Sequence, residues 1–215
     1  MSCRIHEKGF TLVELAIVLV IIGILLGAVL KGQELINNAR IRRVQSDLKG
    51  IEALVWSFFD RYGRMPGDCN KDGIIDARVN NSVSDLDNDP DTGFCASTAP
   101  DGDRDRPWAE LKQAQLLPPD ADNRDLSRHV FNGRFFIGRA NTGGTTYVNA
   151  ISVVDLPCFA AKAIDASIDG NIDAGKGRVR RLTGAYTAST TSDPTWGCAS
   201  EEDLVDLVYF FDKLP

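Results

Sequence analysis

The first part of the chain is almost uninterrupted in its apolar character. Phe10 to Leu30 comprises 21 residues, and Glu14 is the only charged residue among them. At about 1.5 Å of rise per residue, a helix of this length would cross the roughly 30 Å hydrocarbon core of a bilayer. A carboxylate inside such a span is costly and is normally kept for a function. The pattern therefore predicts a membrane-spanning helix in which Glu14 has a functional role.

After residue 30 the pattern becomes amphipathic. Gly63, Pro66 and Gly67 end the helical pattern, so we expect one helix over residues 10–62. Residues 10–30 would form its membrane half, and residues 31–62 would form an amphipathic half that packs against a globular domain. The apolar positions of this second half recur at alternating spacings of three and four, which is the period of one helix face: Ile41, Val44, Leu48, Ile51, Val55, Phe58 and Tyr62.

The rest of the chain, residues 63–215, predicts a globular domain. Up to about residue 128 it is rich in Asp, Asn, Gly and Pro, as long loops are, with one short helix expected over 107–117. Strand patterns follow at 130–139, 145–154, 179–186 and 204–211, with a short helix expected over 157–164. A turn signal at 141–144 favours antiparallel pairing. One long helix followed by late strands indicates the α+β class, with the helix packed on an antiparallel sheet.

The residues that precede the apolar stretch complete a recognisable motif. A short basic leader ends at Gly9, Phe10 follows it, and Glu14 is the fifth residue after that glycine. This N-terminus resembles that of type IV prepilins and type II secretion pseudopilins. The resemblance implies that a prepilin peptidase removes residues 1–9 on the cytoplasmic side and methylates the new N-terminus at Phe10. It also implies that Glu14 pairs with the N-terminal amine of a neighbouring subunit, which would give the costly carboxylate a partner.

The resemblance therefore implies a structural subunit of a type IV pilus or pilus-like filament. Its expected partners are other pilin subunits, the prepilin peptidase, the inner membrane and an assembly platform. The protein would span the inner membrane once before assembly and would then enter a periplasmic or cell-surface filament. Two alternatives stay open, a minor pseudopilin of a type II secretion system and a membrane-anchored, adhesin-like calcium-binding domain. The motif does not identify the extracellular target, and it does not distinguish a major from a minor subunit.

Two simpler explanations account for less of the pattern. A secretory signal peptide has an apolar core of about 7–15 residues, followed by a small-residue cleavage site. This apolar run is longer, and residues 27–31 offer no A-x-A site. An ordinary single-pass anchor would explain the length of the run, but it would leave Glu14 and the Gly9-Phe10 junction as coincidences.

The charge of the chain bears on partners and topology. The formal net charge is −6, and the leader carries a net charge of +1, so the mature chain would be near −7. An acidic surface argues against nucleic acid as a partner of the folded domain. Several Lys and Arg residues follow the span, so the positive-inside rule alone does not place the N-terminus in the cytoplasm. The prepilin resemblance does.

Five cysteines divide between the leader and the globular domain. Cys3 would be lost with the leader, and four would remain outside the cytoplasm, which favours disulfides. Four cysteines allow three connectivities, and we prefer Cys69–Cys95 and Cys158–Cys198 because each closes a local loop. The spacing does not exclude the other two. The absence of a C-x-x-C pair argues against a zinc site or a thioredoxin-like redox motif.

An aspartate-rich stretch over residues 68–105 offers candidate calcium ligands. It holds ten of the 23 aspartates. Within it, five residues match positions 1, 3, 5, 6 and 9 of an EF-hand-type loop: Asp68, Asn70, Asp72, Gly73 and Asp76.

The match to a calcium loop is incomplete. Val79 stands at position 12 in place of a bidentate Glu, so a further ligand would have to come from residues 85–91 or 101–105. A solvated acidic loop, in which Asp and Asn form turns, explains the pattern equally well. The spacing recurs more weakly over 165–173, with Lys176 at position 12, and there a turn between a helix and a strand is the better interpretation.

No catalytic constellation is evident. His129 is the only histidine that would remain after cleavage, and it lies beside an apolar strand pattern. The sequence has no G-x-S-x-G elbow, no P-loop and no G-x-G-x-x-G fingerprint. Trp56, Trp108 and Trp196 are expected to pack in the core. The sequence therefore predicts a protein that is not an enzyme.

Overall fold

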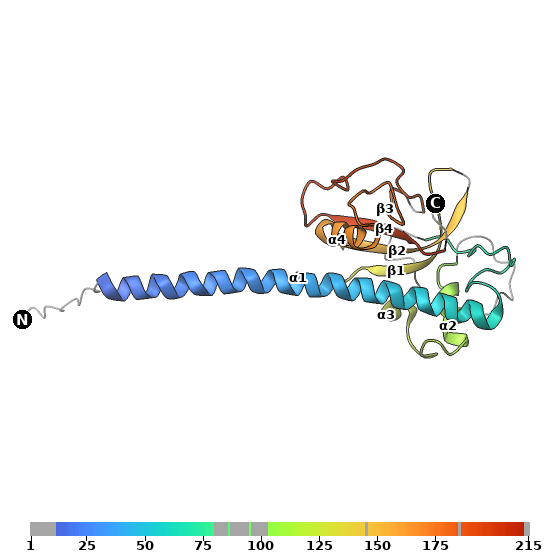
Figure 1. Ribbon diagram of the computed structural model, residues 1–215. Helices are drawn as coiled ribbons and strands as arrows, with labels where there is room; N and C mark the ends of the chain where they lie inside the picture. The colour runs from blue at the N-terminus through green and yellow to red at the C-terminus, as the bar shows by residue number, and fades with distance from the viewer. Residues whose placement is uncertain are drawn as a thin grey trace, which may run out of the picture. The chain divides into compact units, whose positions relative to one another are not determined.

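The structure is a computed structural model of the 215-residue chain, and it describes residues 12–79, 86, 95, 103–144, 146–184 and 186–212. By their contacts the residues form two compact units, 1–40 and 41–215. The elements follow the order of Figure 1: α1 (Leu12–Tyr62), α2 (Arg106–Gln113), α3 (Asn123–Leu126), β1 (Arg134–Asn141), β2 (Tyr147–Pro157), α4 (Cys158–Asp169), β3 (Val179–Arg181) and β4 (Leu204–Phe210).

Helix α1 is continuous from Leu12 to Tyr62, as the sequence predicts. No proline interrupts it, and Gly23, Gly27 and Gly32 are all accommodated within it. In the first unit its large apolar side chains are exposed, from 85% for Leu12 to 45% for Ile22. It is the one helix among the described residues that is long and apolar enough to cross a membrane.

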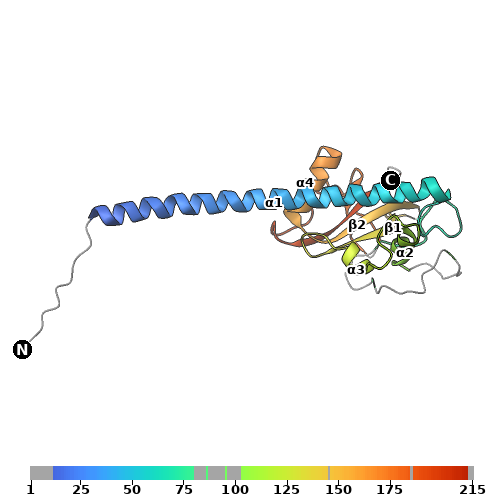
Figure 2. The ribbon, with the colours of Figure 1, turned by 90° about the horizontal axis from the view of Figure 1, so that it is seen from below.

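In the second unit, α1 buries one face. The buried residues are Ile41, Val44, Leu48, Ile51, Val55 and Phe58, which confirms six members of the predicted stripe. Tyr62, the seventh, is half exposed and stacks on Phe58 with 4.5 Å between ring centroids. From residue 41 on, α1 runs alongside β1 and β2 (Figure 2). Its stripe and the facing side of the sheet share one hydrophobic core.

The sheet has four strands in the order β1-β2-β4-β3, and every neighbouring pair is antiparallel. Alternate residues of each strand point to opposite faces, because the side-chain period of a strand is two. Ile151 and Val153 of β2 belong to the core shared with α1, whereas Val148 and Ala150 belong to a second cluster. That second cluster also includes Val79 and other residues outside the strands, so the second face of the sheet is covered too. The predicted α+β class is confirmed.

Two strands differ from the prediction because of local turns. The strand expected over 179–186 contains only Val179–Arg181, since Thr183 N–H and Oγ1 both donate to the Thr187 carbonyl and reverse the chain. The strand expected from 130 begins at Arg134. A turn in which His129 N–H donates to the Gly133 carbonyl precedes it.

The short helices also differ from the prediction at their ends. Helix α2 ends at Gln113, and Gln115 has a φ of 57°. Helix α4 extends to Asp169, where Gly170 caps it at a φ of 79°, a conformation that favours glycine. Helix α3 has no counterpart in the sequence prediction, and the Asp122 carboxylate caps it by accepting from Arg124 N–H. Four residues are too few to produce a helical hydrophobic period.

Gly138 of β1 tests how tightly the edge of the sheet is packed. A Cβ at this position would lie 2.6 Å from the Ala77 carbonyl oxygen and 2.8 Å from Val79 N. We expect Gly138→Ala to lower the free energy of unfolding by about 1–3 kcal/mol, because backbone atoms cannot yield cheaply. Gly50 of α1, where a Cβ would meet nothing within 4 Å, is the matched control. Gly50→Ala should raise stability by about 1 kcal/mol.

Denaturant titration of the detergent-solubilised protein measures both changes. Opposite signs for the two variants are expected. Equal stability of the Gly138→Ala variant and the wild type would contradict the packing described here.

Candidate functional site

Glu14 lies in the first turn of the described part of α1. A carboxylate is favourable in the first turn of a helix, because the backbone N–H groups there carry partial positive charge. Its neighbours along the helix, Leu12, Leu15 and Val18, are exposed apolar residues. The predicted processing residues Gly9 and Phe10 lie outside the described residues. The described helix therefore carries one acidic group in its first turn, four residues along the chain from the predicted new N-terminus.

The first unit presents an extended apolar surface that is unfavourable in contact with water. Contiguous exposed apolar surface of this extent marks a contact with lipid or with other protein. Gly23 and Gly27 are spaced as a G-x-x-x-G pair, and a Cβ added at either would meet nothing within 4 Å. Small residues at this spacing let helices approach closely in a membrane. The exposed large apolar side chains of this unit are Leu12, Val13, Leu15, Ile17, Val18, Leu19, Val20, Ile21, Ile22, Ile24, Leu25, Leu26, Val29, Leu30, Leu35 and Ile36.

Both preferred disulfides are present. Cys69 and Cys95 are bonded with their Cα atoms 5.1 Å apart, and Cys158 and Cys198 are bonded with a Cα separation of 6.5 Å. The second bond ties the start of α4 to the segment before β4. Backbone hydrogen bonds support it, because Cys158 N–H donates to the Asp203 carbonyl at 2.8 Å.

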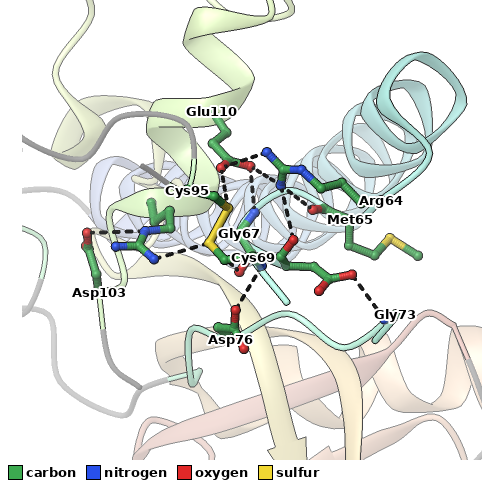
Figure 3. A network of polar contacts seen from close by, with 11 residues as sticks. Arg64, Met65, Gly67, Cys69, Gly73, Asp76, Cys95, Asp103 and Glu110 are labelled. Atoms are coloured by element: carbon green, nitrogen blue, oxygen red, sulfur yellow. Dashed lines mark hydrogen bonds and ion pairs between the residues drawn. A yellow bond between two sulfur atoms is a disulfide. The ribbon is translucent and has the colours of Figure 1, made fainter. Parts of the chain in front are cut away.

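A buried ion pair joins the end of α1 to α2 (Figure 3). Arg64 donates from Nη1 to Glu110 Oε2 at 2.7 Å and from Nη2 to Oε1 at 3.0 Å. Glu110 is fully buried, and it also accepts from Gly67 N–H at 2.8 Å. A buried pair of this kind is tolerated when further hydrogen bonds satisfy both charges, as they do here. No local pattern predicts this pair, because its members are 46 residues apart.

The same cluster brings three potential metal-binding side chains together. Ligand atoms of Cys69, Cys95 and Glu110 lie within 4.8 Å of one another. Both sulfurs are in a disulfide, however, and the ligand form of cysteine is the free thiolate. The cluster is therefore a structural junction at the end of α1.

The predicted calcium ligands form one compact loop after α1. The Asp68 carboxylate accepts from Gly73 N–H at 3.0 Å, and the Asp76 carboxylate accepts from Cys69 N–H at 2.8 Å. Asn70 Oδ1 accepts from Asp72 N–H at 2.9 Å. Most of these side chains thus bind backbone N–H groups of their own loop. The carboxylates of Asp68, Asp72 and Asp76 do not all lie within 4.8 Å of one another.

The far side of this loop is fixed by Asn149 of β2. Asn149 Oδ1 accepts from Ile75 N–H at 2.8 Å, and its Nδ2 donates to the Gly73 carbonyl at 2.8 Å. Asn149 is completely buried. The sequence did not reveal this anchor, because an asparagine inside a strand pattern looks like an outward-facing polar residue.

The weaker acidic repeat forms the turn after α4. Asp165 is fully buried, and its Oδ2 accepts from Asp173 N–H at 2.7 Å and from Trp196 Nε1–H at 3.1 Å. The Asp169 carboxylate accepts from Val179 N–H at 2.8 Å. These carboxylates fasten the loop between α4 and β3, as expected for a turn. Burial raises the pKa of Asp165 to about 6.

His129 has a structural role. It is buried, its Nε2 lies 2.8 Å from the Val154 carbonyl oxygen, and its ring packs against Phe135 with 5.5 Å between centroids. Burial lowers the pKa of His129, which favours the neutral ring. Trp108 and Trp196 are fully buried, and Trp56 packs edge-on against Phe211.

Comparison with known protein families bears on the N-terminus. Residues 4–30 match the family model described as "Prokaryotic N-terminal methylation motif". The chain carries the prepilin-type cleavage and methylation motif of type IV pilins and pseudopilins. The motif indicates a structural, non-enzymatic protein. Comparisons with curated proteins and with solved structures gave no match.

The raised pKa of Asp165 predicts that the stability of the folded protein depends on pH. Its folded pKa of about 6 lies above the ordinary value of 3.8, so the folded protein holds this proton more tightly than the unfolded chain does. Its contribution to stability is present below about pH 4 and is lost as the pH rises through about 6. We therefore expect the stability of the wild type, relative to Asp165→Asn, to fall by up to about 3 kcal/mol between pH 4 and pH 7.

The measurement is denaturant unfolding of both proteins across that pH range. Asp125→Asn is the control, because Asp125 is exposed on α3 and its replacement should leave the difference constant. A difference between wild type and Asp165→Asn that does not change with pH would refute the burial argument.

Proposed function

We propose that this protein is a structural subunit of a type IV pilus or pilus-like filament. The observation that carries the proposal is the prepilin-type motif at residues 4–30, which continues into the exposed apolar part of α1. The apolar half of such a helix is unfavourable in water, so the subunit cannot leave the bilayer with this half uncovered. It must pass from lipid into contact with other apolar helices.

The proposed assembly uses two forces. Apolar helix packing supplies the driving force once the helix leaves the lipid, and it has little directional preference. Pairing of the Glu14 carboxylate with the methylated amine of a neighbour's Phe10 supplies the register. Removing one partner of a desolvated ion pair costs about 3–5 kcal/mol, so an out-of-register neighbour would be strongly disfavoured.

The proposed location follows from the processing and the disulfides. The leader would be cut by the prepilin peptidase at the cytoplasmic face, and the subunit would await assembly as a single-pass inner-membrane protein. Two disulfides in the second unit agree with a domain outside the cytoplasm. An assembly platform and other pilin subunits would then be its partners in the periplasm or at the cell surface.

Two rival functions share this N-terminus. A minor pseudopilin of a type II secretion system would be processed in the same way but would stay in a short periplasmic filament. A membrane-anchored adhesin-like domain would be processed and exported, yet it would never polymerise. Shearing of cells separates these outcomes: a pilus subunit is recovered in long extracellular polymers, whereas the other two stay with the cell.

The Glu14→Ala variant tests the assembly role. We expect it to be inserted and processed normally but to enter filaments at least about tenfold less, because the neighbouring amine loses its buried partner. Immunoblots of sheared and cell-bound fractions measure the ratio.

Glu34→Ala is the matched control for this experiment. Glu34 is also an acidic residue of α1, but it is exposed beside Lys31, with 2.6 Å between the charged groups. The control should assemble normally, since exposed ion pairs of this kind contribute little. Normal filament incorporation of Glu14→Ala would rule out the role assigned to Glu14.

A further inference from the structure

A backbone hydrogen bond closes the loop after α1 at its base. Asp76 N–H donates to the Gly67 carbonyl at 3.0 Å, which joins the two ends of the loop. Cys69 is fixed by its disulfide to Cys95, and Asn149 holds Ile75 from the sheet. Residues 68–76 are therefore held in one conformation from three sides.

Asp68 points into this closed loop. Its Oδ2 accepts from Gly73 N–H at 3.0 Å. The backbone N–H groups of Lys71 and Asp72 also favour the charged carboxylate and so lower its pKa, against the larger effect of burial. Gly73 has a φ of 86°, the turn conformation that brings its N–H back toward Asp68. The carboxylate thus lies inside the loop, surrounded by the backbone of residues 71–73.

One oxygen of this carboxylate is buried without a partner. Asp68 is 1% exposed, and its Oδ1 has no hydrogen-bond partner among the described residues. Leaving a buried polar atom unsatisfied costs about 1–3 kcal/mol, and more for a charged group. The Arg64 guanidinium does not compensate it, because Arg64 donates to the Asp68 backbone carbonyl, at 3.4 Å, and pairs with Glu110.

Further hard oxygen donors follow at the spacing that a calcium loop uses. Asn70 and Asp72 are partly engaged with each other, with Asn70 Nδ2 donating to Asp72 Oδ2 at 2.9 Å on the exposed side of the loop. The Asp72 charge acts on Asp68 and contributes to the raised pKa of Asp68, whose main cause is burial. Asp76 binds Cys69 N–H through Oδ2. Carboxylate and amide oxygens at alternate residues are what Ca²⁺ requires.

We propose that residues 68–76 form a Ca²⁺ site in which Asp68 Oδ1 is the buried ligand and Asn70, Asp72 and Asp76 supply the outer oxygens. Binding requires the Asp72 or Asp76 side chain to turn inward, because the three carboxylates do not all lie within 4.8 Å of one another. Mg²⁺ fits less well, since it demands a near-ideal octahedron at shorter distances. Val79 replaces the bidentate Glu of a tight loop, so the affinity falls in the range of extracellular modules, about 10⁻⁴–10⁻³ M.

Calorimetric titration of the full-length, detergent-solubilised protein with CaCl₂ tests this site. Wild type should bind Ca²⁺ with half-saturation at about 10⁻⁴–10⁻³ M and Mg²⁺ at least about tenfold more weakly. Asp68→Asn should weaken Ca²⁺ binding at least about tenfold, while Asp125→Asn on α3 should bind as the wild type does. Calcium should also raise the melting temperature of the wild type and not that of Asp68→Asn.

A second variant protects the test against misfolding. Asp72 lies on the exposed side of the loop, so Asp72→Asn leaves the fold intact and should also weaken binding. Unchanged Ca²⁺ affinity in both variants would overturn the proposal, as would a wild type that gives neither binding heat nor a shift in melting temperature. Loss of binding in Asp165→Asn with retention in Asp68→Asn would place the ion at the loop after α4 and would equally refute this site.

Discussion

The buried stripe of α1, from Ile41 to Phe58, packs against the inner face of the sheet, and the second unit is organised around that contact. Each fully buried aliphatic or aromatic side chain contributes about 1.5–3 kcal/mol, so six of them on one helix face dominate the attachment. A polar contact fixes its register, because Lys49 Nζ donates to the Tyr209 hydroxyl at 2.5 Å and the hydroxyl donates to Glu52 at 3.1 Å. The sheet, α2 and the disulfide-bonded loop then pack around this rigid helix.

The same helix changes its side-chain pattern before residue 31. All its backbone hydrogen bonds are internal, so it can pass through lipid without unsatisfied groups. Its side chains there are apolar on every face, which suits lipid or a bundle of like helices and suits water poorly. Glu14 is the exception, and its cost in such surroundings explains why a paired role is proposed for it. The sequence of α1 thus places an all-apolar half and an amphipathic half on one continuous helix.

The parts that the sequence could predict depend on local periodicity. The continuity of α1, its buried stripe and the α+β class all follow from spacings of three, four and two residues. Local loop closure favoured the observed disulfide pairing, between cysteines 26 and 40 residues apart, but it left the other two connectivities open. The prepilin motif is likewise a local pattern, confined to residues 4–30.

The parts that the sequence could not predict depend on distant contacts. Arg64 and Glu110 meet only because α2 folds back on the end of α1, and Asn149 meets the acidic loop only because β2 lies beside it. The burial of Asp68 and Asp165 is a property of the packed domain, whereas both read as turn residues in the sequence. β3 is shorter than the predicted strand because the chain turns where Thr183 N–H donates to the Thr187 carbonyl.

We infer that α1 becomes an assembly element only after prepilin-type processing. Mass spectrometry of the N-terminal peptide from the mature protein tests it most directly. We expect the chain to begin at Phe10, with residues 1–9 absent and one methyl group on the Phe10 amine. An unmethylated chain that still begins at Met1, or one cut after the apolar stretch near residues 27–31, would contradict prepilin-type processing.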